Sequence, residues 1–223
     1  MPPESKANGS QTNRSAAETA YQFVKARLLD GRLPGGVLLS EGELAQQLGV
    51  SRTPVRQAFV QLQAEGLLEL YPKRGALVVP ISASEADDVY EARLLIEAHC
   101  ARRVAAAGSA PVAELEEAIA DQEAALQAGG AEFAAADRRF HRAIVAAAGN
   151  ALLTRQYDAL RDRHQRIAAA TVARDPSRVE RFIAEHRGIL AALDGGDADD
   201  VAARVEAHLD GAHELARRPR AGT

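Results

Sequence analysis

The sequence places one aspartate and three histidines where helices would otherwise present apolar side chains. Asp137 and His141 are four residues apart, so their side chains share one face of a helix. His186 and His208 interrupt the apolar stripes of two later helices in the same way. A buried carboxylate without a partner is costly, and a divalent cation held by one carboxylate and three imidazoles removes that cost. This donor set suits Zn²⁺, Ni²⁺ or Mn²⁺, so we expect a metal site with zinc as the first candidate.

Each of these residues also has an ordinary interpretation, and so do two neighbours of the expected site. Asp137 and His141 alone would form a pair on a helix surface, and a single inward histidine is usually hydrogen-bonded in the core. Arg93 precedes Glu97 by one turn, so it either pairs with Glu97 on the surface or faces a cavity and binds an acidic ligand. His164 either lines the same cavity or is a core histidine. We take Arg93 and His164 as candidate ligand contacts.

A second set of candidate binding residues lies on two short predicted helices and the hairpin after them. Ser40 and Glu43 form a capping box for the first helix, and Gly49 favours its end. Ser51 is expected to cap the second helix, in whose first turn Pro54 is tolerated. The polar face of that helix suits base edges and phosphates, because arginine can bind guanine through two hydrogen bonds. The candidate DNA contacts are Ser51, Arg52, Thr53, Arg56, Gln57, Lys73, Arg74 and Gly75.

The elements around these residues predict a winged helix-turn-helix. A first helix is expected over Ser15–Asp30, and two strands over Leu67–Leu70 and Ala76–Val79 form the hairpin. Three helices followed by such a hairpin match the winged arrangement. Arg74 at the hairpin tip can then reach into or near the minor groove, and Gly75 permits close approach of the backbone.

The rest of the chain predicts a mainly α fold. After the hairpin there is no further strand pattern, and glycines, a proline and polar caps divide the sequence into helices of an antiparallel bundle. The expected helices span residues 84–107, 112–128, 132–148, 152–173, 178–194 and 198–217. The expected domains are a disordered tail over 1–14, the winged helix-turn-helix over 15–80, a linker over 81–83, the helical ligand- and metal-binding domain over 84–217 and a basic tail over 218–223.

Charge and composition limit the possible functions. The 223 residues carry a formal charge of -4, but residues 1–80 have nine Lys or Arg against seven Asp or Glu. The N-terminal part is mildly basic and the rest of the chain is acidic. This indicates that one part of the protein attracts DNA, and it argues against a protein that coats nucleic acid along its length. The one cysteine, Cys100, excludes an internal disulfide framework. No apolar run is long enough to span a bilayer, and Met1–Arg14 lacks the apolar core of a signal peptide, so we expect a soluble cytoplasmic protein with no membrane partner.

The chain from about Ala16 to Leu215 resembles GntR-family transcriptional regulators of the FadR-like subgroup, which carry an FCD-type effector domain. The N-terminal residues that carry the resemblance are Pro34-Gly35, Leu39-Ser40-Glu41, Leu44-Ala45, Leu48 to Arg56, Leu62, Gly66-Leu67 and Arg74-Gly75. The C-terminal ones are Glu91-Ala92-Arg93, Asp137 to His141, Ala148-Gly149-Asn150, Glu185-His186 and His208-Leu209.

The resemblance implies a homodimer that binds a short palindromic operator in double-stranded DNA and responds to a small organic acid. It also implies a metal at Asp137, His141, His186 and His208, near an effector pocket that a basic residue at the position of Arg93 often lines. The sequence departs from the family at two positions. Gly42 stands where relatives often carry an arginine that can contact DNA, and Gln57 stands where glutamate is usual.

Three functions follow from these features. The first is a ligand-responsive transcriptional regulator, expected to be a repressor and not an enzyme, in which a carboxylate effector alters operator affinity. The second is a regulator in which the metal itself is the signal. The third is a metal-dependent hydrolase, because three histidines and an aspartate can activate water. The third has no use for the polar surface of residues 51–56, and no motif supplies a separate general base.

Overall fold

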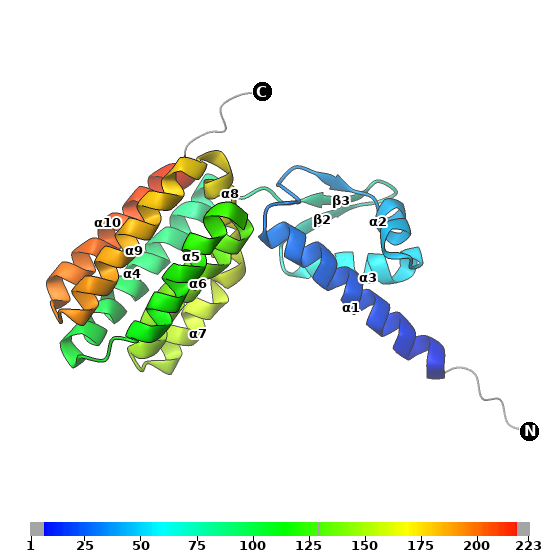
Figure 1. Ribbon diagram of the computed structural model, residues 1–223. Helices are drawn as coiled ribbons and strands as arrows, with labels where there is room; N and C mark the ends of the chain where they lie inside the picture. Colours follow the sequence, from blue (N-terminus) through cyan, green and yellow to red (C-terminus); the bar gives the residue numbers. More distant parts are fainter. Residues whose placement is uncertain (1–6, 129, 218–223) are drawn as a thin grey trace, which may run out of the picture. The chain divides into compact units, whose positions relative to one another are not determined.

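The computed structural model describes residues 7–128 and 130–217 and divides the chain into two units (Figure 1). The division falls after Pro80, so the first unit is Met1–Pro80 and the second is Ile81–Thr223. Among the described residues, no helix combines the length and the apolar character that crossing a membrane requires. The expected basic tail, 218–223, and the first six residues lie outside the described part of the chain.

The N-terminal unit is a winged helix-turn-helix, as the sequence predicts. Its strands form one antiparallel sheet in the order β1-β3-β2, with Leu38 opposite Leu77 and Tyr71 opposite Gly75. The core lies between α1, α3 and the sheet, and Val24, Phe59 and Val78 are fully buried in it. The elements are α1 (Ala7–Leu29), β1 (Leu38–Leu39), α2 (Glu41–Leu48), α3 (Arg52–Ala64), β2 (Leu68–Tyr71) and β3 (Gly75–Val78).

The predicted N-cap serine makes its capping hydrogen bond at α2 but not at α3. The Ser40 side chain accepts a hydrogen bond from the backbone N–H of Glu43, and Gly49 ends α2 in the left-handed conformation with φ 66°. Ser51 occupies the N-cap position of α3, but its side chain makes no capping hydrogen bond. Pro54 explains this difference, because it is the third residue of the helix and has no backbone N–H to donate.

The C-terminal unit is an all-α bundle, in which α4 packs along α10 and α5 packs along α6 (Figure 1). Its core consists of the predicted apolar stripes, which leave polar side chains at only a few buried positions. The elements are α4 (Ala83–Ala107), α5 (Val112–Ala128), α6 (Gly130–Ala147), α7 (Ala151–Ala159), α8 (Arg161–Arg174), the 3₁₀ turn η1 (Pro176–Arg178), α9 (Val179–Asp194) and α10 (Ala198–Arg217).

Two sequence-based expectations about helices are wrong. The single helix expected over 152–173 is two helices, which meet at Leu160, where the backbone N–H bonds to the carbonyl of Tyr157 in a tight turn. Neither glycine nor proline marks this break, so the residues themselves gave no sign of it. Residues 7–14, expected to be disordered, are helical, because extending an existing helix costs far less than starting one and no proline interrupts this stretch.

Candidate metal centre and DNA interface

The four predicted metal ligands converge inside the C-terminal unit. Asp137 and His141 come from α6, His186 from α9 and His208 from α10, and all four side chains are buried. The Nε2 atom of His186 lies 3.2 Å from Nε2 of His141 and 3.2 Å from Nε2 of His208. Oδ1 of Asp137 lies 3.5 Å from Nε2 of His186, and one ligand atom from each residue falls within 4.8 Å of the others. The predicted set is therefore brought together by three helices.

An oxygen from a further residue lies against the other ring nitrogen of each histidine. Nδ1 of His141 lies 2.7 Å from Oε2 of Glu97 on α4. Nδ1 of His186 and Nδ1 of His208 have acceptors 2.8 Å away. The residues that supply these oxygens were not predicted as parts of the site: Glu97, Gln122 and Glu185.

These acceptors determine which nitrogen faces the centre. A ring that donates its Nδ1 proton to an acceptor presents the lone pair of Nε2, as metal-binding histidines do. Zinc–nitrogen bonds of about 2.0–2.1 Å in a tetrahedron separate the nitrogens by about 3.3 Å, close to the observed 3.2 Å. Three ring nitrogens and one carboxylate converge on the same point, and once a cation displaces the proton on His141 these donors fit a divalent metal.

The electrostatic environment keeps two of the three histidines unprotonated and Asp137 ionised, as binding a cation requires. Burial and the neighbouring histidines lower the pKa of His186, and burial lowers the pKa of His208, so both rings are neutral at pH 7. Burial opposes the charged form of His141, but Glu97 and Asp137 overcome it and raise its pKa to about 9. Burial likewise opposes ionisation of Asp137, and the histidines nevertheless hold its pKa well below its usual range. One proton on His141 therefore balances part of the acidic charge when no metal is bound.

Arg93 resolves the two alternatives left open by the sequence. It pairs with Glu97, Nε to Oε1 2.7 Å, but the pair is buried, with each side chain 2% exposed, rather than on the helix surface. Its Nη1 lies 2.6 Å from Nε2 of His164, and burial and Arg93 lower the pKa of His164 to about 3. His164 is thus a neutral acceptor for Arg93. The hydroxyl of Tyr157 also donates to Oε1 of Glu97, at 2.8 Å.

A small cavity adjoins the centre. Asp137 and His208 form part of its wall, Arg93 and His164 form another part, and apolar side chains such as Phe182 complete it. Its volume of about 20 Å³ accommodates a water molecule and little more. The structure therefore places both predicted ligand contacts, Arg93 and His164, beside the four metal-site residues.

The predicted DNA contacts form an exposed face of the N-terminal unit. A groove of about 490 Å³ lies between α3 and the wing, with Arg52 and Arg56 on one side and Lys73 and Arg74 on the other. Among the described residues, these four cations have no ion pair within the protein, and all four are exposed. The remaining predicted contacts on α3, Ser51, Thr53 and Gln57, are exposed as well.

One of the two glycines near this groove has a structural role that the sequence did not indicate. A Cβ at Gly42 would lie 3.4 Å from the guanidinium of Arg52, which is an ordinary van der Waals contact, so the structure leaves room for a side chain there. A Cβ at Gly75 would overlap the carbonyl oxygen of Leu39, and its φ of 112° is unfavourable for other residues. The close backbone approach at Gly75 is therefore to strand β1 within the protein.

A winged helix-turn-helix followed by an all-α bundle with a buried Asp and His cluster is the arrangement of a two-domain bacterial regulator. Comparison with protein families agrees: the model of the bacterial regulatory proteins of the gntR family matches residues 16–78, and the FCD domain model matches residues 88–211. The chain belongs to the GntR family and is a transcriptional regulator with an FCD domain.

Relatives cover most of the chain. A probable D-xylose utilization operon transcriptional repressor of Paenarthrobacter nicotinovorans is 32% identical over 189 residues, 84% of this chain and 83% of the relative. The transcriptional repressor RspR of Escherichia coli K12 is 28% identical over 202 residues, 90% of this chain and 88% of the relative. A solved structure of a putative GntR regulator from Rhodococcus sp. RHA1 shares the fold, with a TM-score of 0.74 at 19% identity over 91% of this chain and 97% of that one.

These findings decide between the expected functions. The family and its relatives are DNA-binding transcriptional regulators rather than enzymes, so the metal-dependent hydrolase is set aside. GntR regulators bind operator DNA, and FCD domains bind small-molecule effectors. The buried Asp and His cluster is geometrically able to hold a metal.

Proposed function

We propose that this protein is a homodimeric repressor whose operator affinity changes when a small organic acid binds beside a divalent metal, with zinc as the expected ion. One observation carries the proposal. Three Nε2 atoms and the carboxylate of Asp137 converge next to a cavity that Arg93 also lines. Asp137, His141, His186 and His208 would hold the metal, and the bound ion would supply a Lewis-acidic position for an anionic group.

The charges around the cavity favour an anionic effector. Asp137 and Glu97 are ionised, because their cationic neighbours outweigh the effect of burial and lower their pKa values, and Arg93 contributes one positive charge. A divalent ion that replaces the proton on His141 leaves this group of charges positive by one unit. A carboxylate neutralises that excess, and the positive charge of Arg93 lies in the cavity wall.

The size of the cavity connects binding to a change in shape. At about 20 Å³ it is smaller than any organic acid, so a ligand must displace lining side chains such as those of α8 and α10. A ligand that binds one arrangement of the bundle better than another shifts the population between them. In a dimer, such a shift alters the spacing of the two DNA-binding units and hence the affinity for the operator.

On DNA, the two copies of α3 would occupy successive major grooves of a palindromic site. Arg52 and Arg56 would read bases or bind phosphates, with help from Thr53 and Gln57 on the same exposed face. Arg74 and Lys73 would hold the wing against the backbone of the DNA.

The small cavity also supports an alternative, in which the metal itself is the signal. Four protein ligands complete a tetrahedral set without any further group. In that case operator affinity would follow metal concentration alone, and organic acids would have no effect at constant metal.

Metal analysis combined with DNA binding tests the proposal. We expect about one metal ion per chain in the purified protein, and much less in the His186→Ala and His208→Ala variants, because each loses one of four donors. The control is His99→Ala, an exposed histidine outside the cluster, which should retain the metal. Equal metal content in all four proteins would refute the site.

Operator binding is then measured with DNA that the protein itself selects from a random pool. We expect small carboxylic acids, screened at constant metal, to change the affinity of the wild-type protein and of His99→Ala but not of His186→Ala. A change produced by metal alone, with no response to any acid, would support the metal-responsive alternative instead.

A further inference from the structure

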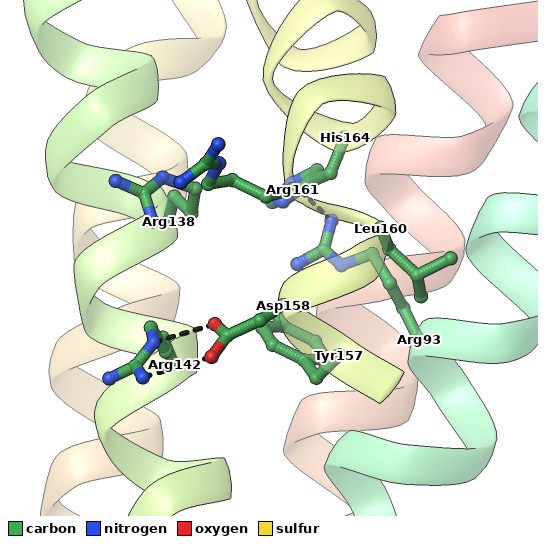
Figure 2. Close-up of a pocket in the computed structure, with 8 residues that line it drawn as sticks. All are labelled: Arg93, Arg138, Arg142, Tyr157, Asp158, Leu160, Arg161 and His164. Atoms are coloured by element: carbon green, nitrogen blue, oxygen red, sulfur yellow. Dashed lines mark hydrogen bonds and ion pairs between the residues drawn. The ribbon is translucent and has the colours of Figure 1, made fainter. Parts of the chain in front are cut away.

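A second pocket lies between α4, α6 and the break between α7 and α8, and four arginines line it (Figure 2). We call it the arginine pocket and define it by Arg93, Arg138, Arg142, Arg161 and the single acid Asp158. Figure 2 shows Arg93 extending into it from α4 toward α6, which carries Arg138 and Arg142. Arg93 also lines the cavity beside the metal centre, so its side chain belongs to the wall between the two spaces.

The acidic side chains near this pocket, Asp158 and Asp162, each form an ion pair with an arginine other than Arg93 and Arg138. Asp158 accepts two hydrogen bonds from Arg142, Nε to Oδ1 2.7 Å and Nη2 to Oδ2 3.0 Å. Arg161 pairs with its neighbour Asp162 at 2.9 Å. Arg138 has no ion pair among the described residues, and its Nε is buried without a hydrogen-bond partner. The pocket therefore carries a positive charge that no side chain in the described part of the chain pairs with.

Arg93 contributes a second unsatisfied donor. Its Nε is used by Glu97 and its Nη1 lies against His164, whereas its Nη2 is buried without a partner. Figure 2 shows this remaining nitrogen pointing into the pocket, away from His164. A buried donor left unsatisfied costs free energy, so two such donors on arginines that line one pocket mark a place for an acceptor.

We propose that the arginine pocket binds an oxyanion group, the phosphate or carboxylate of a small metabolite, through Arg138 and Nη2 of Arg93. Guanidinium groups bind such groups through paired, charge-assisted hydrogen bonds. The site is distinct from the metal centre, since neither Arg138 nor Arg161 contributes to the Asp and His cluster. It goes beyond the proposed effector site and does not depend on a metal being bound.

The test uses the full-length, metal-loaded chain with ¹⁵N-labelled arginine and follows the side-chain Nε–H signals by NMR. The Arg138 signal is assigned by its absence in Arg138→Gln. Titration with inorganic phosphate, and separately with acetate at constant chloride, should move that signal to saturation with at least one of the two anions. The matched variants below then show whether the anion is bound by Arg138 or only changes its surroundings.

Matched variants measure how much Arg138 contributes. Thermal stabilisation by the active anion should require at least about a tenfold higher concentration in Arg138→Gln, because a charge-assisted hydrogen bond contributes on that order. The control is Arg139→Gln, which changes an exposed arginine on the same helix as Arg138. Arg139 pairs with Asp121 of α5, and this variant should respond like the wild type. An Arg138 signal that neither anion moves, or equal responses of the two variants, would overturn the proposal. Saturation by phosphate alone or by acetate alone identifies the chemical group.

Discussion

At the scale of single residues, each histidine of the candidate metal centre has an oxygen of a second residue beside its Nδ1. His186 and His208 present Nε2 to the centre because Nδ1 of each ring is hydrogen-bonded to an oxygen, whereas Nδ1 of His141 lies 2.7 Å from Oε2 of Glu97 without hydrogen-bond alignment. Glu97 has two functions, since it also accepts hydrogen bonds from Arg93 and Tyr157. The metal centre and the candidate effector contact are therefore joined through one carboxylate.

This arrangement predicts proton release when the metal binds. His141, with its pKa raised to about 9, is protonated at pH 7, whereas His186 and His208 are neutral. Metal uptake at pH 7 should therefore release about one proton, and affinity should rise about tenfold per pH unit up to pH 9. Calorimetry in buffers of different ionisation enthalpy measures the proton count. Glu97→Gln removes the main charge that raises this pKa, so it should release fewer protons; no release from the wild type would contradict the prediction.

At the scale of elements, short irregular segments place the functional residues. The break at Leu160 separates α7, which carries Tyr157, from α8, which carries His164, and both side chains face Arg93 or its partner Glu97. In the N-terminal unit, the wing is positioned by the pairing of β3 with β1, where Gly75 packs against the carbonyl of Leu39.

Replacing Gly75 should therefore destabilise the N-terminal unit. Gly75→Ala places a Cβ against the carbonyl oxygen of Leu39 at a φ of 112°, and we expect a loss of about 2–4 kcal/mol. Gly36→Ala is the matched control, because φ is 89° but no atom lies within 4 Å of the new Cβ, so the cost should be about 1 kcal/mol. Chemical denaturation followed by circular dichroism measures both variants. Similar losses for the two would show that the contact with Leu39 is unimportant.

At the scale of the whole molecule, charge is divided between the two units. Residues 1–80 are mildly basic, whereas the chain as a whole has a formal charge of -4. We therefore expect attraction to DNA at the face of α3 and the wing, and we expect the acidic bundle to limit binding to arbitrary DNA. A homodimer would present that face twice. Each substitution in it would then reduce the favourable free energy of operator binding twice, once in each half-site.

We predict that Arg56→Ala weakens binding of the dimer to a palindromic operator by about 2–6 kcal/mol, twice the ~1–3 kcal/mol expected for one base contact. On DNA that contains one half-site, the loss should be about half as large. Fluorescence anisotropy at fixed salt measures both values. Gln63→Ala, an exposed change near the other end of α3, should have little effect. Unchanged affinity of Arg56→Ala would exclude Arg56 as a base contact.

The sequence by itself determined the winged helix-turn-helix, the helical bundle and the four candidate metal ligands. Each depends on local spacing: inward Asp137 and His141 are one helical turn apart, and Gly49 ends α2 as its conformation requires. Only the tertiary structure decided what lies opposite these residues. Glu97, Gln122 and the unpaired Arg138 are ordinary polar residues in the sequence, and the break at Leu160 has no glycine or proline. Their roles depend on contacts between helices distant in sequence, and local spacing carries no information about such contacts.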